Sequence, residues 1–414
     1  MMIAEEYLSR SRLYRRLRDG SHGDLVERYA ARLVEVGLAC QGTRRSLGLV
    51  GGLLSWIASS RSVLAELDER MVERYLRNRA RKRPILPGDR LALKRFLSVL
   101  RDAGMIAPAK PPQITAQDQI FAKFADYLQK ERGLAAGSIN AYSPAIRRFL
   151  SEVCPAGVDD LGKISRSDVV RYVERQARDG SPGSGKAMCW SLRAFLRYLY
   201  RKRLNRVPLA GCVPSIRQWK LANLPTYLSA EQVQNVLDGC DRASAIGRRD
   251  YAILMMLAKL GLRANEVATL TLDDIDWRCG EMRVRAKGRQ LVGMPIPPDV
   301  GAAVVAYLRD GRPKSPCRKL FLRTRAPHLG FASHSAITVI AKTAVARAGI
   351  RGLARQGAHL FRHSLATELL RAGATLSEIG QLLGHKSHDT TRIYAKVDID
   401  ALRTLSLPWP GDAQ

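Results

Sequence analysis

Apolar and polar positions follow the period of an α-helix through most of the first 225 residues. Apolar residues three and four positions apart share one face of a helix, so each such stretch predicts an amphipathic helix with one buried side. Glycines follow several of these stretches, and prolines at 108–112 separate two groups of four. The predicted helices cover 24–36, 43–57, 68–78, 91–103, 119–131, 138–153, 167–178 and 185–203.

The second group of four helices repeats the plan of the first. Matching residues recur at separations of 96 to 99 positions, so the loops differ only slightly in length. Three glycines inside the second helix of the first group weaken its helix propensity. The first group is therefore either a degenerate copy of the second or an unrelated bundle with a chance likeness. The aligned pairs are Gly37 and Gly133, Tyr75 and Tyr172, and Phe96 and Phe195, and the three glycines are Gly48, Gly51 and Gly52.

The last part of the chain combines helices with a few extended stretches. Ser229 and Gln232 have the spacing of a capping box, which predicts a helix start. Cys279 and Gly280 form a turn signal, which predicts a β-hairpin over 277–286, and we expect a mainly α fold with a small sheet. The other predicted elements are helices over 251–262, 300–308 and 333–348, a helix that starts at 359, an extended stretch over 291–296 and a short strand over 319–323.

Two proline-rich stretches mark the boundaries between predicted domains. The second of them, 206–227, carries Arg217 and Lys220 between its prolines. An extended, positively charged linker of this kind is suited to crossing a phosphate backbone. The predicted domains are 1–112, 113–225 and 226–414.

The chain is strongly basic, with a formal net charge of +30 over 414 residues. The three predicted domains have 22 basic against 12 acidic residues, 19 against 9 and 27 against 17, so each carries +10. Such a balance favours a polyanionic partner, and the even spread predicts that all three domains approach nucleic acid. An arginine-rich composition can also reflect a GC-rich genome, which is the competing interpretation.

Cysteine usage and targeting signals indicate the compartment. Seven scattered cysteines without a Cys-x-x-Cys pair are typical of reduced thiols in the cytoplasm. No apolar stretch is long enough for a membrane helix or a secretion signal. The five arginines between positions 10 and 18 fit either a basic helix on DNA or a solvated tail. We expect a cytoplasmic protein, associated with the nucleoid when bound to DNA, with no membrane partner.

Four residues suited to moving a phosphodiester bond lie between positions 359 and 394. His359 and Arg362 begin an amphipathic helix three residues apart, so they share a face near the positive end of its dipole, where an anion is stabilised. His385 directly follows the glycine that ends the next helix, and Tyr394 comes nine residues later. One such residue alone is usually structural, but their order and spacing favour a catalytic site.

This order, His-x-x-Arg, then Gly-His, then Tyr, resembles the C-terminal signature of the tyrosine recombinases, also called the phage integrase family. Residues 261–266 resemble the family's Gly-Leu-Arg-x-x-Glu box, which implies that Arg263 is the first catalytic arginine and Glu266 its structural companion. The family's catalytic lysine lies in a hairpin turn, and Lys287 is the candidate. Two positions depart from the family pattern, Val292 in place of a basic residue and Phe361 in place of leucine.

The resemblance implies the reaction and the role of each residue. Tyr394 would attack phosphorus, while Arg263 and Arg362 would hold the non-bridging oxygens in the transition state. Lys287 would protonate the departing 5′-oxygen. The 3′-phosphotyrosine bond keeps the phosphoester energy, so the reaction needs no ATP, metal or other cofactor.

Two histidines complete the implied site. His359 would accept the tyrosine proton or steady the phosphate as a neutral donor, and His385 would donate a hydrogen bond to the phosphate. Other histidines lack the spacing of metal ligands. Six basic residues are further candidates for contact with DNA: Arg147, Arg148, Arg217, Lys220, Arg285 and Arg289.

The resemblance further implies a core-binding helical domain over 113–225 and a catalytic domain over 226–414. Residues 1–112 would be an extra module for DNA binding or assembly. The partners would be double-stranded DNA, further copies of the chain in a tetramer on two DNA sites, and other recombinases that share the reaction. We expect a site-specific recombinase of a mobile element. The alternatives are a DNA-binding regulator of the same fold without turnover and an enzyme that resembles a type IB topoisomerase.

Overall fold

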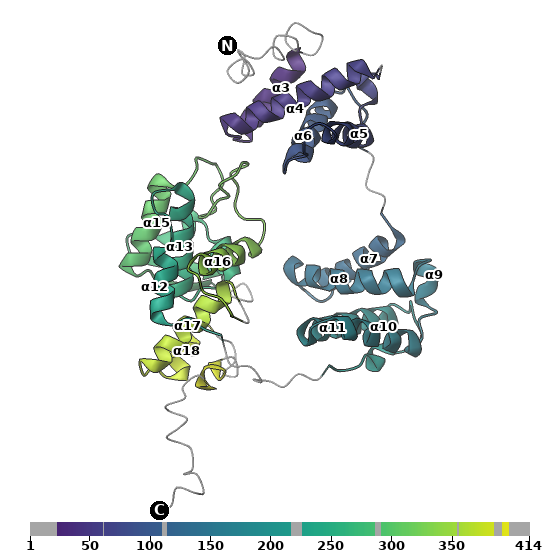
Figure 1. Cartoon of the computed structure of the whole chain (residues 1–414). Coiled ribbons are helices and arrows are strands. Elements are labelled where there is room, and N and C mark those ends of the chain that lie inside the picture. The colour runs from purple at the N-terminus through teal and green to yellow at the C-terminus, as the bar shows by residue number, and fades with distance from the viewer. Residues whose placement is uncertain are drawn as a thin grey trace, which may run out of the picture. The chain divides into compact units, whose positions relative to one another are not determined.

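The computed structural model describes residues 23–60, 62–109, 114–216, 226–285, 291–353, 356–384 and 391–396 (Figure 1). They pack into two compact units, one within 110–222 and the other within 1–109 and 223–414. The first part of the chain and the last part each have their own hydrophobic core. The fold is mainly α with one small sheet, which confirms the predicted class.

Residues 23–109, called the first module below, form a helical bundle. Its core consists of the apolar faces of four amphipathic helices and includes Tyr29, Leu53 and Phe96, all fully buried. The predicted boundaries agree within a few residues, and the second helix is longer at both ends than 43–57. The helices are α3 (Gly23–Glu35), α4 (Cys40–Ser59), α5 (Glu69–Ala80) and α6 (Asp89–Asp102), with the 3₁₀ turn η1 (Leu64–Glu66).

Residues 114–216, called the second module below, form another helical bundle. Its core is rich in aromatic residues, with Phe124, Phe149 and Phe195 fully buried. Capping boxes at Thr115 and Ser165 fix the starts of two helices. The elements are α7 (Ala116–Lys130), α8 (Ala136–Val153), α9 (Val158–Leu161), α10 (Arg166–Asp179), α11 (Pro182–Arg201) and η2 (Leu209–Cys212).

The residues from 226 onward are built around one buried helix, α13. Residues 252–258 of α13 are all buried, because α12, α14, α15, α16 and α17 pack against it (Figure 1). Because residues 252–258 are buried on every side of the helix, they are apolar without interruption, whereas a helix with one exposed side would be amphipathic. The helices are α12 (Ala230–Asp238), α13 (Ala245–Lys259), α14 (Ala264–Thr269), α15 (Pro298–Asp310), α16 (Ser335–Arg347), α17 (Ala358–Arg371) and α18 (Leu376–Leu382), with 3₁₀ turns η3 (Leu272–Asp274) and η4 (Tyr394–Lys396).

Three antiparallel strands form the sheet in the order β1-β2-β3. Strand β2 pairs with β1 through Met282 and Ile275, and with β3 through Arg285 and Leu291. Met282 and Val284 face the core, because alternate residues of a strand point to the same side of the sheet. The strands are β1 (Ile275–Asp276), β2 (Glu281–Arg285) and β3 (Leu291–Pro295).

The predicted strand over 319–323 was wrong. Only isolated bridges form there, Lys319 with Thr271 and Leu322 with Gly330. Leu320, Phe321 and Leu322 are nevertheless fully buried. Residues 320–322 are therefore apolar because they are buried in the core, not because they form a strand of the sheet.

Candidate active site

Arg263 is held at the start of α14 by Glu266. The Glu266 carboxylate accepts hydrogen bonds from the backbone N–H and from Nη1 of Arg263, both at 2.7 Å, and it is buried. A second guanidinium nitrogen, Nη2, donates to the carbonyl of Gly384 at 3.3 Å. The arginine is thus fixed at both ends, in keeping with the role expected of Glu266 as its structural companion.

The turn before Arg263 also positions the second arginine. Gly261 has a φ of +59°, and an added Cβ would lie 2.7 Å from a methyl group of Leu383, so glycine is required there. The carbonyl of Gly261 accepts a hydrogen bond from Arg362 Nη1 at 2.6 Å, and the carbonyl of Leu383 accepts one from Arg362 Nη2. The guanidiniums of Arg263 and Arg362 therefore both bind carbonyls at the end of α18.

Arg362 is 5% exposed and remains a cation at neutral pH. Burial and, to a smaller extent, the neighbouring Arg263 lower its pKa to about 10, while Glu266 and Tyr394 act in the opposite direction. Because a pKa of about 10 is well above 7, the guanidinium keeps its charge. Two fixed cations side by side provide the donors that a pentacoordinate phosphate requires.

Tyr394 lies in η4, and its side chain is 1% exposed. Its ring packs in a small apolar cluster with Ala366 from α17 and with Ile379 and Leu383 from α18 and its end. Burial raises the pKa of the phenol, while Arg362 and Arg263 act against that rise. The tyrosine therefore lies within the electrostatic field of both arginines.

The tyrosine hydroxyl bonds to a histidine that the sequence analysis did not select. Nδ1 of His363 lies 3.0 Å from the hydroxyl of Tyr394, and their ring centroids are 5.6 Å apart. His359, selected from the sequence, lies one helical turn earlier on α17, with its ring centroid 6.5 Å from that of His363. The sequence did contain a signal for His363: it follows Arg362 directly and lies four residues after His359, so the two histidines share one face of the helix.

Five of the predicted site residues lie outside the residues that the structure describes: Lys287, His385, Arg217, Lys220 and Arg289. Lys287 falls between β2 and β3, whose facing ends are paired. Lys287 was expected in a hairpin turn, and the segment that contains it connects two paired strands. The roles of all five stay predictions.

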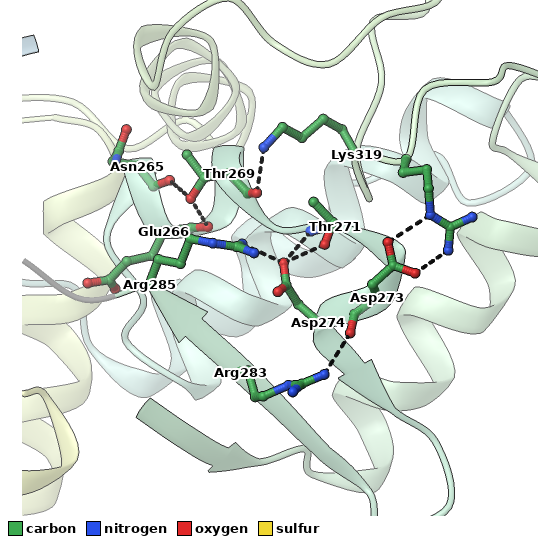
Figure 2. Close-up of polar contacts among 10 residues, drawn as sticks. Asn265, Glu266, Thr269, Thr271, Asp273, Asp274, Arg283, Arg285 and Lys319 are labelled. Carbon is green, nitrogen blue, oxygen red and sulfur yellow. Dashed lines mark hydrogen bonds and ion pairs between the residues drawn. The ribbon is translucent and has the colours of Figure 1, made fainter. Parts of the chain in front are cut away.

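Arg285, a candidate for phosphate contact, is engaged within the protein (Figure 2). Its Nη1 donates to Oδ2 of Asp274 at 2.6 Å, and the same oxygen accepts from the backbone N–H and the hydroxyl of Thr271. Burial alone would raise the pKa of Asp274, but the hydrogen bonds from Arg285 and Thr271 outweigh it and lower the pKa. This network anchors the end of β2, from which residues 286–290 continue.

The two candidates on α8 also have partners within the second module. Arg147 pairs with Asp118, donates to the hydroxyl of Ser143 at 2.9 Å and lies over the ring of Phe121. Arg148 donates to the side-chain oxygen of Gln176 at 3.0 Å. Both belong to exposed positions of α8, so contact with a phosphate would require these bonds to rearrange.

Within the described part of the chain, His, Cys, Asp and Glu side chains form no group of three or more able to hold a metal ion. Among the same residues, no helix is long and apolar enough to cross a membrane.

Comparison with known proteins identifies the family of this chain. Residues 226–400 match the phage integrase family, and residues 121–203 match its N-terminal SAM-like domain. A putative integrase/recombinase of Sinorhizobium fredii (strain NBRC 101917 / NGR234), y4rA, is 39% identical over 93% of this chain and 94% of its own. Tyrosine recombinase XerD of Mycobacterium tuberculosis (strain ATCC 25618 / H37Rv) is 31% identical over 70% of this chain and 95% of its own.

The fold has a counterpart among solved structures. The crystal structure of XerH site-specific recombinase bound to palindromic difH substrate, a post-cleavage complex, aligns with a TM-score of 0.54. The alignment has 17% sequence identity and covers 86% of this chain and 94% of that one. Fold and sequence together define a site-specific recombinase that breaks and rejoins DNA. The chain belongs to the phage integrase family, the tyrosine recombinases.

Proposed function

We propose that Tyr394 is the nucleophile of this recombinase and forms a 3′-phosphotyrosine bond with one DNA strand. The observation that carries the proposal is the position of the tyrosine beside Arg362 and Arg263, which both act on its pKa. A phenol is a weak nucleophile at neutral pH, so it needs cations that favour its charged form and the negative charge on phosphorus.

Arg263 and Arg362 would stabilise the transition state through its non-bridging oxygens. Backbone carbonyls and Glu266 fix both guanidiniums before DNA binds, so little reorganisation accompanies the reaction. Removal of either arginine is expected to raise the barrier by about 3 to 4 kcal/mol, the effect of losing one preorganised donor.

The remaining roles follow the family pattern. Lys287 would protonate the departing 5′-oxygen, and His385 and His359 would bind the phosphate. The free 5′-hydroxyl of a second strand would then attack the phosphotyrosine bond, which restores Tyr394 and completes the exchange.

Strand exchange sets the number of copies required. One Tyr394 forms one covalent bond, and two duplexes that exchange both strands undergo four cuts, so four copies on two DNA sites would act together. The three domains 1–112, 113–225 and 226–414 would each contact DNA, because each carries the same net positive charge. The enzyme would act on the DNA of the nucleoid, in the cytoplasm. Its substrate would be the DNA of a mobile genetic element.

A covalent-trapping experiment tests the proposal. Purified protein is incubated with nicked duplexes taken from the DNA that flanks its gene, and adducts are separated on a denaturing gel. Wild-type protein should form an adduct, Tyr394→Phe should bind DNA with unchanged affinity and form none, and Tyr251→Phe, a partly buried tyrosine on α13, should react as the wild type does. An adduct with Tyr394→Phe would exclude Tyr394 as the nucleophile.

A further inference from the structure

Helix α17 presents two histidines one turn apart, and the structure distinguishes between them. His363 Nδ1 lies at hydrogen-bonding distance, 3.0 Å, from the Tyr394 hydroxyl. The signature pattern points instead to His359, whose ring centroid is 6.5 Å from that of His363. Geometry is the first requirement of a general base, because proton transfer needs heavy atoms about 2.6 to 3.2 Å apart.

We propose that His363 accepts the proton of Tyr394 when the tyrosine attacks DNA. The inference rests on the proposed role of Tyr394 and adds a catalytic residue to it. His359 is left to bind the phosphate, next to Arg362 on the same helix.

The surroundings of Tyr394 explain why a base in contact with the hydroxyl matters. The side chain is 1% exposed, so bulk water does not reach the phenol to take its proton. Its ring is enclosed by Ala366, Ile379 and Leu383, which offer no acceptor side chain. A neutral imidazole has one nitrogen that accepts, and at His363 the atom that faces the hydroxyl is Nδ1.

The proposed step is balanced in atoms and charge. The O–H bond of Tyr394 breaks, an N–H bond forms at His363 Nδ1, and the phenolic oxygen bonds to phosphorus. The bond from phosphorus to the 5′-oxygen breaks, and that oxygen takes a proton from the general acid assigned to Lys287. In the rejoining step the His363 imidazolium returns its proton to the departing tyrosine, by microscopic reversibility.

Four charged or titratable groups near the pair belong to the described residues. Arg362 and His359 lie on α17, Arg263 lies at the start of α14, and its partner Glu266 lies within α14. Arg362 keeps its charge throughout the neutral range, because its pKa is about 10. A change in rate between about pH 5.5 and 8.5 is therefore expected to report an imidazole.

The test compares His363→Asn with His359→Asn and Lys287→Ala in the full-length protein. The side-chain oxygen of asparagine stands near the place of Nδ1, so it keeps a hydrogen bond to Tyr394 but takes no proton. Single-turnover adduct formation is measured from about pH 5.5 to 8.5 on the nicked substrate. A second substrate carries sulfur in place of the 5′-bridging oxygen, because a thiolate leaves without protonation.

Under the proposal, His363→Asn slows adduct formation on the order of 100-fold on both substrates and loses the rise in rate with pH. Lys287→Ala is slow on the oxygen substrate and recovers on the sulfur one, while His359→Asn keeps the rise in rate with pH. DNA affinity close to that of the wild type shows that each variant folds.

Two results overturn the inference. One is a His363→Asn rate within about threefold of the wild type at every pH. The other is a slow His363→Asn variant that the sulfur substrate restores, since that would place His363 on the leaving-group side. In both cases wild-type protein still forms the Tyr394 adduct, so the proposed function survives. If Tyr394→Phe forms the adduct, the proposed function and this inference fail together.

Discussion

The two helical modules share an internal framework and differ in the charge of one pair of matching helices, α5 and α10. In the first module the Tyr75 hydroxyl on α5 donates to the carbonyl of Leu49 on α4, at 3.3 Å. In the second, the Tyr172 hydroxyl on α10 donates to the carbonyl of Ala145 on α8, at 3.4 Å. The donors are 97 positions apart and the acceptors 96, which matches the aligned register of the sequence.

A second pair of contacts repeats in the same way. Tyr29 meets Phe96 edge to face at 5.3 Å between centroids, and Phe124 meets Phe195 edge to face at 5.2 Å, with Phe124 one position off the aligned register of Tyr29. Chance likeness between two bundles predicts shared periodicity, not the same hydrogen bond and the same ring contact. These equivalent contacts support the interpretation of the first module as a copy of the second.

The exposed positions of the paired helices α5 and α10 have diverged. Arg77 is exposed on α5, and the aligned position on α10 holds Glu174, also exposed. Between positions 70 and 83 the first module has seven basic residues and one acidic residue. The two modules thus share internal contacts and differ on this surface, which is expected where two modules bind different partners or different parts of one DNA.

The largest effect is expected from exchanging this charge. Arg77→Glu should weaken binding to the target DNA by about tenfold near physiological salt and lower the slope of affinity against salt concentration by about 1, because a phosphate contact is lost. Glu174→Arg should leave the affinity unchanged or raise it. Fluorescence anisotropy at several salt concentrations measures both.

Equal affinity and an equal salt slope for Arg77→Glu would show that α5 does not contact phosphate. The charge difference between the modules would then concern protein assembly rather than DNA.

The sequence predicted the bundles well because local apolar periodicity determines an amphipathic helix. It predicted Arg263, Arg362 and Tyr394 as neighbours from the order of a known signature, and the structure brings them together. It did not select His363, although His363 lies four residues after His359, because only the fold brings it to the Tyr394 hydroxyl 31 positions later.

Other features also depended on tertiary contacts. The carboxylate that binds Arg285 comes from Asp274, eleven positions earlier, and only the turn into β2 brings the two together. The run over 319–323 looked extended because its three middle residues are apolar, and a short apolar run has the same pattern in a buried strand as in a segment buried between helices. Packing against α13 and its neighbours, which the sequence does not state, decided its conformation.

A smaller effect is expected at Gly52, where the copies pack differently. A Cβ at Gly52 would lie 2.5 Å from the Tyr75 hydroxyl, whereas the aligned Arg148 carries a full side chain. Gly52→Ala should destabilise the protein by about 1 kcal/mol, because the clash exceeds the gain in helix propensity. In a Tyr75→Phe background the same change should stabilise it by about 0.5 to 1 kcal/mol.

Urea unfolding of the four variants gives the coupling between Gly52 and Tyr75. Gly48→Ala is the matched control, because a Cβ there meets no atom within 4 Å and should be stabilising in both backgrounds. Equal effects of Gly52→Ala with and without the hydroxyl would show that Tyr75 moves aside at no cost.

The smallest effect is expected at the ends of α6 and α11, where different residues adopt the same left-handed backbone conformation. Gly104 and Arg203 both have a left-handed backbone, with φ of 69° and 56°, and the next N–H in each case donates to a carbonyl five residues before it, at 2.9 Å. Glycine adopts this conformation freely, whereas arginine is strained in it. Gly104→Ala should therefore destabilise the first module by about 1 kcal/mol, and Arg203→Gly should stabilise the second by up to about 1 kcal/mol. Opposite shifts of the urea midpoint would support a common helix end inherited by both modules, and shifts of the same sign would show that Arg203 gains enough from contacts of its side chain to offset the strain.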